Sequence, residues 1–187
     1  MRKYFPALLL LIIHFPQVIY SQPAAHTLTR KESFFGLHFD FHASSADTLI
    51  GNTVTEAMVD SLLTIVKPDF IQVDCKGHPG FSSYPTKAGI PARGFVKDPL
   101  HIFRKVTAAH NVALYVHYSG VYDIEAVRQH PEWAVIQADG KPDAEKTSVH
   151  GDYVYKLLIP QLKELSSTYS LDGVWVDGDC WATKPDY

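Results

Sequence analysis

The sequence predicts an α/β fold of the (β/α)8 TIM-barrel type, of which the 187 residues would supply only the first four βα units, a truncated half barrel. Apolar segments typical of strands alternate with segments whose apolar residues have helical spacing, and this alternation indicates βαβ units and a parallel sheet. Each expected strand also turns polar at its carboxyl end, where β/α barrels hold their active sites. A whole barrel needs ~250 residues.

The first βα unit is expected to combine a strand at residues 33–42 with a helix at residues 53–66. The strand segment, SFFGLHFDFH, is rich in the aromatic residues that strands favour. The helix is expected to begin at Thr53, which has capping-box spacing to Glu56. The second strand follows at residues 69–75 (DFIQVDC).

The second helix has clear signals at its start. Asp98 is expected to cap it, Pro99 to take its first position, and the helix to end near His110. The third strand is expected at residues 112–118 (VALYVHY), where β-branched and aromatic residues are again enriched.

The last unit begins after a long connection at residues 119–147, in which we expect one short helix at residues 123–129. A longer helix is predicted at residues 149–168, with a kink at Pro160 because proline cannot donate a backbone hydrogen bond. The fourth strand is predicted at residues 171–177 (LDGVWVD).

A small open sheet of the flavodoxin type is the alternative fold. Such a sheet binds its ligand at a topological switch point, commonly through a glycine-rich loop. The sequence contains no glycine-rich phosphate loop, which favours the barrel.

Composition and charge narrow the function classes. Hydrophobic residues make up 46% and charged residues 20% of the chain, a globular composition that excludes disordered and collagen-like proteins. The formal net charge of −3 lacks the basic footprint of a non-specific nucleic-acid binder, so no nucleic-acid partner is expected.

Residues 1–21 are predicted to be a signal peptide. Arg2 and Lys3 precede an apolar run at residues 7–13, and Ser21 offers a small residue for cleavage. The apolar run is shorter than the ~20 residues that span a bilayer, so we expect a secreted or periplasmic protein with no membrane span after cleavage. A short membrane anchor is the alternative. Residues 22–32 are then a linker, and residues 33–187 the amino-terminal half of a catalytic barrel.

Cysteine usage excludes a disulfide framework, because the chain has only Cys75 and Cys180. One bridge between them is possible, and two separate thiols at strand ends are the preferred interpretation.

The polar residues at the expected strand ends are the candidate site residues. In chain order they are His38, Asp40 and His42, then Asp74, Lys76 and His78, then His117 and Tyr118, and finally Asp177, Asp179 and Trp181. Turns and helix caps also favour Asp, and this is the alternative explanation. Four consecutive strands with the same arrangement favour a cleft that binds hydroxyl groups.

Asp177 has the position that sugar chemistry requires. It ends an apolar strand, and a fixed, partly desolvated carboxylate can attack or stabilise an oxocarbenium-like anomeric carbon. Trp181, just beyond the strand, could stack on a sugar ring, whereas Trp175 within the strand is expected to belong to the core.

Four segments, in order, resemble α-L-fucosidases of glycoside hydrolase family 29. Residues 75–81 (CKGHPGF), followed by residues 84–87 (YPTK), resemble that family's Lys-His-His-Asp-Gly-Phe segment and its trailing Pro-Ser-Lys. Residues 35–41 (FGLHFDF) resemble its first strand, Phe-Gly-Ile-Phe-Ile-His-Trp, and residues 114–119 its third-strand Tyr-Tyr-Ser. Residues 172–181 resemble the fourth-strand segment that carries the nucleophile.

The resemblance implies a retaining, exo-acting glycoside hydrolase that needs neither cofactor nor metal. Asp177 matches the nucleophile, and His78 matches the second of two substrate-binding histidines. The other residues expected to contact the carbohydrate substrate are Lys76, Asp40, His38, Tyr118 and Trp181. The general acid/base would lie beyond Tyr187, so these 187 residues alone are expected to be inactive.

The chain also departs from the family pattern. Gly77 stands where the first histidine of the pair is expected, and Asp40 stands where the first strand has its histidine. These departures concern fucose specificity more than the enzyme class.

Three other functions remain open. Residues 130–134 (HPEWA) and 139–142 (DGKP) resemble a segment of other barrel glycosidases, including amylase-like ones. His38, Asp40 and His42 have the period of 2 that places side chains on one strand face, and they resemble the metal-binding first strand of amidohydrolase-like enzymes. A non-catalytic sugar-binding relative is the third alternative.

Overall fold

The computed structural model of the chain describes residues 30–178. The predicted signal peptide, Cys180 and Trp181 lie outside the described residues, as does most of the predicted linker, of which Arg30–Glu32 form a 3-10 turn. None of the described helices is long and apolar enough to cross a membrane.

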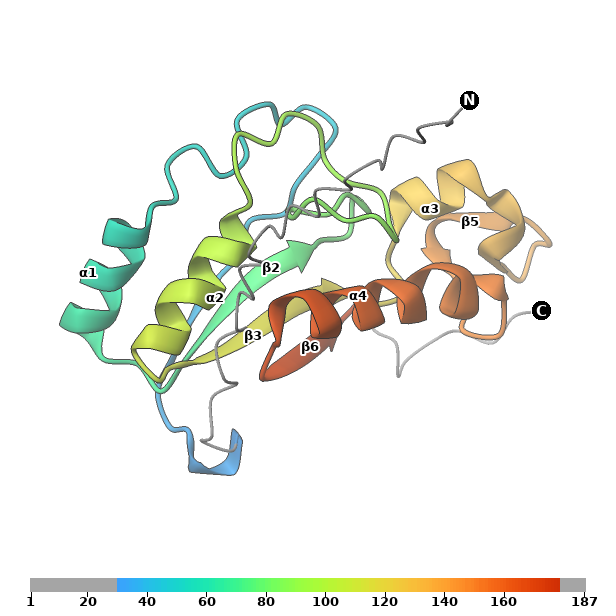
Figure 1. Cartoon of the computed structure of the whole chain (residues 1–187). Helices are drawn as coiled ribbons and strands as arrows, with labels where there is room; N and C mark the ends of the chain where they lie inside the picture. Colours follow the sequence, from blue (N-terminus) through green and yellow to red (C-terminus); the bar gives the residue numbers. More distant parts are fainter. Residues whose placement is uncertain (1–29, 179–187) are drawn as a thin grey trace, which may run out of the picture.

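The centre of the fold is a four-stranded parallel sheet in the order β1-β2-β3-β6 (Figure 1). Its strands are β1 (Gly36–Phe39), β2 (Phe70–Lys76), β3 (Ala113–Ser119) and β6 (Gly173–Asp177). The prediction of an α/β fold with a parallel sheet is therefore confirmed. The spatial order follows the chain, as in consecutive units of a barrel, whereas a flavodoxin-type sheet reverses its order at a switch point. The flavodoxin alternative is therefore wrong.

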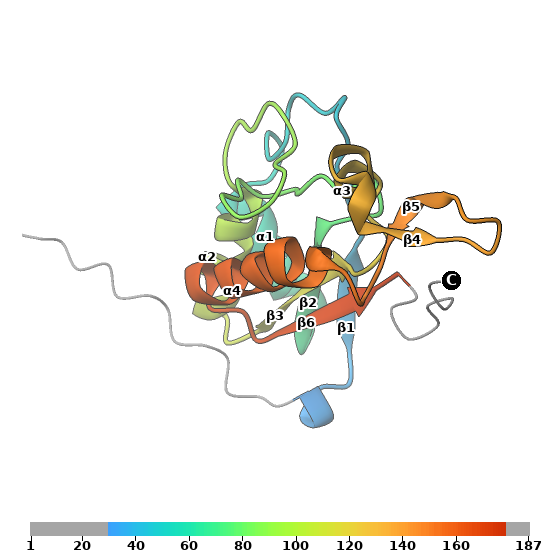
Figure 2. The same cartoon turned by 90° about the vertical axis from the view of Figure 1, so that its right-hand side faces the viewer.

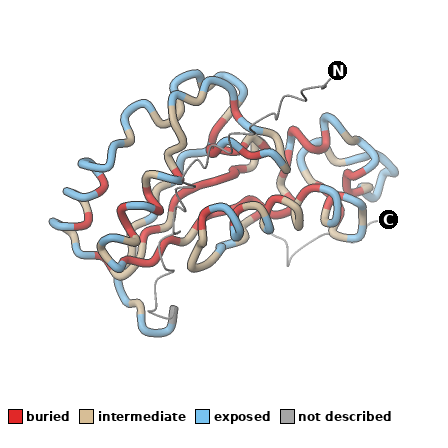
Figure 3. The backbone as a smooth tube through the Cα atoms, viewed as in Figure 1, coloured by how far each residue is buried: buried red, intermediate tan, exposed pale blue. Residues whose placement is uncertain are grey.

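Three helical segments cover one face of this sheet (Figures 1 and 2). They are α1 (Glu56–Val66), α2 (Pro99–Ala109) and α4 (Ile159–Tyr169), which continues a π-helical turn at Val154–Leu158. Their apolar side chains meet those of the strands in one core, shown in red along the strands and helices of Figure 3 and including Leu63, Ile71, Phe103, Leu114, Val116 and Leu165.

The helix ends show how local sequence sets the element boundaries. The side chain of Asp98 accepts a hydrogen bond from the backbone of His101, and Pro99 opens α2, as predicted. At α1 the cap is Thr55, which accepts from the backbone of Met58, and not Thr53 as expected. Pro160 lies where the π-helical turn gives way to α4, so the expected irregularity is a change of helix type.

A smaller unit lies beyond the carboxyl ends of the strands (Figure 1). It consists of α3 (Ile124–Gln129), a 3-10 turn at Pro131–Trp133 and an antiparallel hairpin of β4 (Ala134–Ile136) and β5 (Pro142–Thr147). The helix was predicted, but the hairpin was not. Its second strand is polar and largely exposed, so it has no apolar alternation, and only the Asp-Gly turn at Gly140, with φ 82°, signals it.

The second face of the sheet carries large side chains over glycine positions. A Cβ atom at Gly36 would lie 2.1 Å from the ring of Phe70, and one at Gly173 would lie 2.3 Å from the ring of Tyr115, so a larger residue at either position would have to displace the ring beside it. Trp175 lies on this face with 49% of its surface exposed, and the expectation that it belongs to the core is wrong.

A β-bulge in β2 separates two residues that the sequence placed together. Asp74 pairs in register with His117, but Lys76 pairs with Tyr118, so Cys75 is the extra residue on β2. An ideal strand would point the side chains of Asp74 and Lys76 to the same face. The bulge instead turns Lys76 away from Asp74.

Lys76 and Tyr118 are therefore core residues, contrary to the expectation that they bind sugar. Lys76 is fully buried, pairs with Asp123, and lies 2.9 Å from the hydroxyl of Tyr153. Burial lowers the pKa of Lys76, while the nearby Asp123 opposes that shift. Its ammonium group also lies over the ring of Tyr118, 4.6 Å from the centroid. The Tyr118 hydroxyl in turn donates to Gln161, so neither side chain is available to a ligand.

Replacing Lys76 by Met is expected to lower the free energy of unfolding by about 3–5 kcal/mol, because it leaves the carboxylate of Asp123 buried without its cation. Urea denaturation followed by circular dichroism measures the loss. The matched control is Lys105→Ala, which breaks the exposed pair with Glu56 and should cost less than about 1 kcal/mol. Equal losses in the two variants would contradict the structural role of Lys76.

Candidate active site

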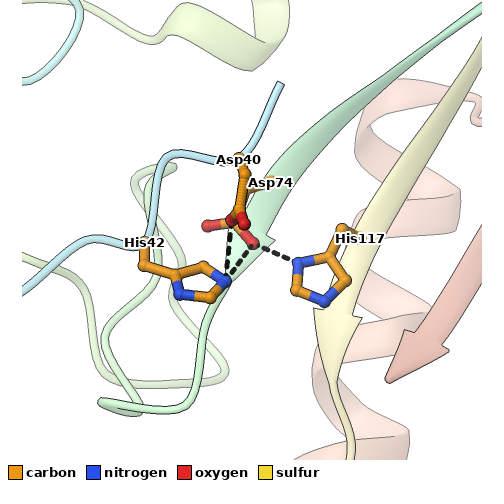
Figure 4. A group of neighbouring side chains, drawn as sticks. All are labelled: Asp40, His42, Asp74 and His117. Carbon is orange, nitrogen blue, oxygen red and sulfur yellow. Dashed lines mark hydrogen bonds and ion pairs between the residues drawn. The ribbon is translucent and has the colours of Figure 1, made fainter. Parts of the chain in front are cut away.

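Polar side chains from β1, β2, β3 and β6 converge at the carboxyl edge of the sheet. Asp74 and His117 lie on β2 and β3 and are buried, whereas Asp40 and His42 lie in the segment after β1 and are exposed (Figure 4). Asp177 ends β6 and contacts the same cluster. Because β1 ends at Phe39, the period of 2 expected for His38, Asp40 and His42 does not continue through all three residues.

His117 connects two carboxylates. Its Nδ1 lies 2.5 Å from Oδ1 of Asp74, and its Nε2 lies 3.2 Å from Oδ2 of Asp177. Burial lowers the pKa of His117, but the hydrogen bonds and negative charges of Asp74 and Asp177 outweigh burial and raise that pKa above its ordinary value. The raised pKa widens the pH range in which both ring nitrogens carry a proton, and in that form each nitrogen donates to one carboxylate.

Asp177 is held in its ionised form. Burial raises its pKa, but the backbone N–H of Gly178 and the ring of His117 have the larger combined effect and lower it. About 40% of the side chain remains exposed, so the carboxylate is accessible to a ligand. A fixed, ionised and accessible carboxylate at a strand end can act as a nucleophile.

His42 fills the space beside Gly77. Its Nε2 pairs with Oδ1 of Asp40 at 2.8 Å, and its ring stacks with those of His117 and His78 at centroid distances of 5.5 and 5.8 Å. A Cβ atom at Gly77 would lie only 2.5 Å from the His42 ring. No larger residue can replace Gly77 while His42 has this position.

His78 is oriented by its neighbours. The hydroxyl of Ser119 donates to the backbone oxygen of Tyr122 at 2.6 Å, so it accepts from Nδ1 of His78 at 2.8 Å. The ring of His78 also stacks on that of Tyr122, with centroids 4.8 Å apart. These contacts fix the imidazole at the edge of the cluster.

His38 lies next to the cluster on the open face of the sheet. Its Nδ1 is 3.1 Å from Nε2 of Gln72, and its ring meets those of Trp175 and His117 edge-on at 5.7 and 5.9 Å. The structure thus places His38, Asp40, His78 and Asp177 at the same edge of the sheet, and their roles in binding or catalysis stay predictions.

Asp74, His42 and His117 belong to the site but were not among the residues predicted to bind substrate. All three lie at or just after strand ends, and that position had marked them as candidate site residues without giving them a role in substrate binding. Trp181, which was predicted to stack on a sugar ring, lies outside the described part of the chain.

An apolar cavity of about 950 Å3 adjoins the cluster. Asp40, His42 and Asp74 form its polar wall, and Phe39, Met58 and Phe103 contribute to its apolar side. A ligand in this cavity would lie against the polar cluster, and a mainly apolar pocket with a few polar groups is the usual form of a small-molecule site.

No family model matches the sequence, and no curated protein matches it either. Solved structures do match the fold. α-L-Fucosidase isoenzyme 2 from Paenibacillus thiaminolyticus matches with a TM-score of 0.68 and 20% identity, over 78% of this chain and 23% of that one. A mutant of α-L-fucosidase AlfC bound to a fucoside matches with a TM-score of 0.51 and 18% identity, over 67% of this chain and 42% of that one.

Several of the structural neighbours are thus α-L-fucosidases. The resemblance inferred from the sequence is confirmed at the level of the fold. A hypothetical protein from Ruminiclostridium thermocellum matches with a TM-score of 0.56 and 16% identity, over 74% of this chain and 75% of that one. The chain spans about a quarter of the length of the Paenibacillus enzyme, so the fold, and not the activity, is what these structures share with it.

Replacing Asp74 by Asn is expected to lower the pKa of His117, because the ring loses a charged acceptor while remaining buried. NMR titration of the imidazole protons in metal-free buffer measures this pKa. The stability that His117 contributes is present at low pH and is lost as the pH rises through its raised pKa. With a lower pKa in Asp74→Asn, that stability should be lost at a lower pH. Asp60→Asn, which removes the carboxylate that pairs with His110 outside the site, is the control and should leave the His117 titration unchanged. An unchanged His117 titration in Asp74→Asn would contradict the bridging arrangement.

Proposed function

We propose that this chain is part of a retaining glycoside hydrolase that acts as an exo-α-L-fucosidase on oligosaccharides or polysaccharides. The observation that carries the proposal is Asp177, an accessible and ionised carboxylate at the end of β6, in a fold similar to that of α-L-fucosidases. The nearest alternative is a barrel glycosidase with a different substrate, because the same carboxylate could attack the anomeric carbon of another sugar.

In the proposed mechanism a carboxylate oxygen of Asp177 attacks the anomeric carbon as the bond to the leaving oxygen breaks. A general acid protonates that oxygen, and a covalent glycosyl–enzyme forms through an oxocarbenium-like transition state. The same residue, now a base, then deprotonates a water molecule that displaces Asp177. The carboxyl groups of the two residues should lie about 5 Å apart in a retaining enzyme.

The general acid is proposed to come from outside the described residues. Within residues 30–178 the carboxylates beside Asp177 are already engaged, Asp74 by His117 and Asp40 by His42. Residues 30–178 alone are accordingly proposed to lack turnover.

The histidines supply hydroxyl-binding groups. His78 is fixed by Ser119 and Tyr122, and His38 and Asp40 are exposed at the same edge of the sheet as Asp177. His42 is proposed to replace the histidine that the fucosidase pattern has at position 77, because its ring occupies the space next to the Gly77 backbone. Imidazole groups can donate to or accept from sugar hydroxyls.

Localisation and domain organisation belong to the same proposal. Residues 1–21 would direct export to the periplasm or the medium, residues 22–32 would form a linker, and residues 33–187 would form the first half of the barrel.

Asp177→Asn in the complete protein is expected to lower hydrolysis of 4-nitrophenyl α-L-fucopyranoside by at least ~1,000-fold, because the amide is a poor nucleophile. Adding azide to Asp177→Gly should restore release of nitrophenol and form β-fucosyl azide, since azide enters from the vacated face. Asp139→Asn, on the exposed hairpin turn, is the control. Near-normal rates in Asp177→Asn would contradict the proposal. If the unmutated protein released nitrophenol only from a different glycoside, fucose would be wrong as the substrate sugar but the enzyme class would stand.

A swap of His42 and Gly77 tests the proposed replacement. His42→Gly is expected to lower kcat/KM by about 10–100-fold through loss of a hydrogen bond to substrate. Gly77→His alone should destabilise the fold, because its Cβ would collide with His42. The double variant should recover activity relative to His42→Gly, a non-additive result expected of residues that share one space. Strictly additive losses would contradict the replacement.

A further inference from the structure

We propose that Asp40, His42, Asp74 and His117 form a binding site for one divalent transition-metal ion, of which Zn2+ fits best. This inference goes beyond the proposed hydrolase activity and does not depend on it. It rests on the geometry of the four side chains, on their chemistry, and on an unsatisfied buried oxygen.

The geometry suits a single ion. One ligand atom from each residue lies within 4.8 Å of every other (Figure 4). Ligand atoms about 2.0–2.2 Å from a tetrahedral Zn2+ lie roughly 3.3 Å from one another. The contacts here are 2.5 Å between Asp74 and His117, 2.8 Å between Asp40 and His42, and 3.9 Å between Asp74 and His42. The widest separation in the set, up to 4.8 Å, exceeds the tetrahedral value by roughly 1.5 Å, so binding of the ion requires shifts of the ligand atoms toward it.

The placement of the four residues allows those shifts. Asp74 and His117 lie on neighbouring strands of the sheet, which fixes half of the site. Asp40 and His42 lie in the exposed segment after β1, which can adjust to the ion and leaves an access path from solvent.

The donor set selects the kind of metal. Two imidazole nitrogens with two carboxylate oxygens form a common zinc ligand set, whereas Mg2+ and Ca2+ prefer oxygen donors alone. Two carboxylates also balance the charge of a divalent ion.

Asp74 provides independent support. Its side chain is buried, and its Oδ2 atom has no hydrogen-bond partner within the described residues. An unpartnered buried carboxylate oxygen is costly. The other oxygen, Oδ1, is the one that contacts His42 and His117 (Figure 4). An ion held by both oxygens of Asp74 would also satisfy Oδ2.

The second nitrogen of His117 has the partner that a metal ligand usually has. With Nδ1 facing the cluster, Nε2 faces Oδ2 of Asp177 at 3.2 Å. Metal-binding histidines commonly donate their other N–H to a carboxylate, which fixes the ring and increases its basicity. Asp177 would keep this hydrogen bond while the ion replaces the proton on Nδ1.

The test measures metal content directly. The purified full chain is stripped with EDTA, equilibrated with ZnCl2 and analysed for zinc per chain, and Co2+ is substituted to record its visible spectrum. We expect one equivalent of zinc and the intense bands of four-coordinate Co2+. Asp177→Asn removes the hydrogen-bonding partner of a ligand and should weaken zinc binding by roughly 10–100-fold. Asp40→Asn and His42→Gln, on the exposed segment, each remove a ligand and should weaken zinc binding by more than that.

His110→Ala is the matched control, because His110 also pairs with a carboxylate, Asp60, but lies outside the cluster. Circular dichroism in EDTA verifies that each variant is folded. The proposal would be overturned if the chain bound no zinc. It would also be overturned if zinc binding were unchanged in both Asp40→Asn and His42→Gln, or if it weakened equally in His110→Ala. Fucoside hydrolysis is measured separately, so either proposal can fail without the other.

Discussion

The β-bulge at Cys75 determines where the most important charges of this fold lie. Because of the bulge, the side chain of Asp74 lies in the site and that of Lys76 lies in the core, although only one residue separates them. Lys76 then binds Asp123, whose other oxygen caps α3, and contacts Tyr153 on the helical segment before α4. The ion pair therefore ties β2 to the unit beyond the strand ends. Asp74, on the other side of the bulge, is buried where it can hold His117.

The site depends on this buried carboxylate. Asp74 fixes one nitrogen of His117, and the other nitrogen is thereby directed to Asp177. A proton on the ring serves to keep Asp177 ionised, whereas a metal ion at Nδ1 would leave the hydrogen bond to Asp177 in place. One arrangement of side chains thus supports both the proposed nucleophile and the proposed metal site.

Local signals predicted local structure well. The Asp98 cap and Pro99 fixed the start of α2, and the apolar bodies of β2 and β3 were found because their side chains belong to one core. The polar strand ends correctly indicated a cluster. The bulge at Cys75 could not be predicted, because residues 70–76 have the composition of a regular strand.

The other errors also have physical reasons. The hairpin at residues 134–147 has a polar second strand that periodicity does not detect. Trp175 has the composition of a core residue, but it lies on the face opposite the described helices. His42 was identified as a strand residue, whereas its role follows from a loop that passes Gly77. Each of these depends on contacts between segments far apart in the sequence.

The central claim is that Asp177 is the residue that attacks the sugar. Incubation of the complete protein with 2-fluoro-fucosyl fluoride should trap the glycosyl–enzyme, because the fluorine at carbon 2 slows its hydrolysis. Proteolysis and mass spectrometry would then locate the adduct. The account predicts one 2-fluorofucosyl group on the peptide that contains Asp177. An adduct on a different carboxylate, or fucoside hydrolysis without any adduct on Asp177, would contradict it.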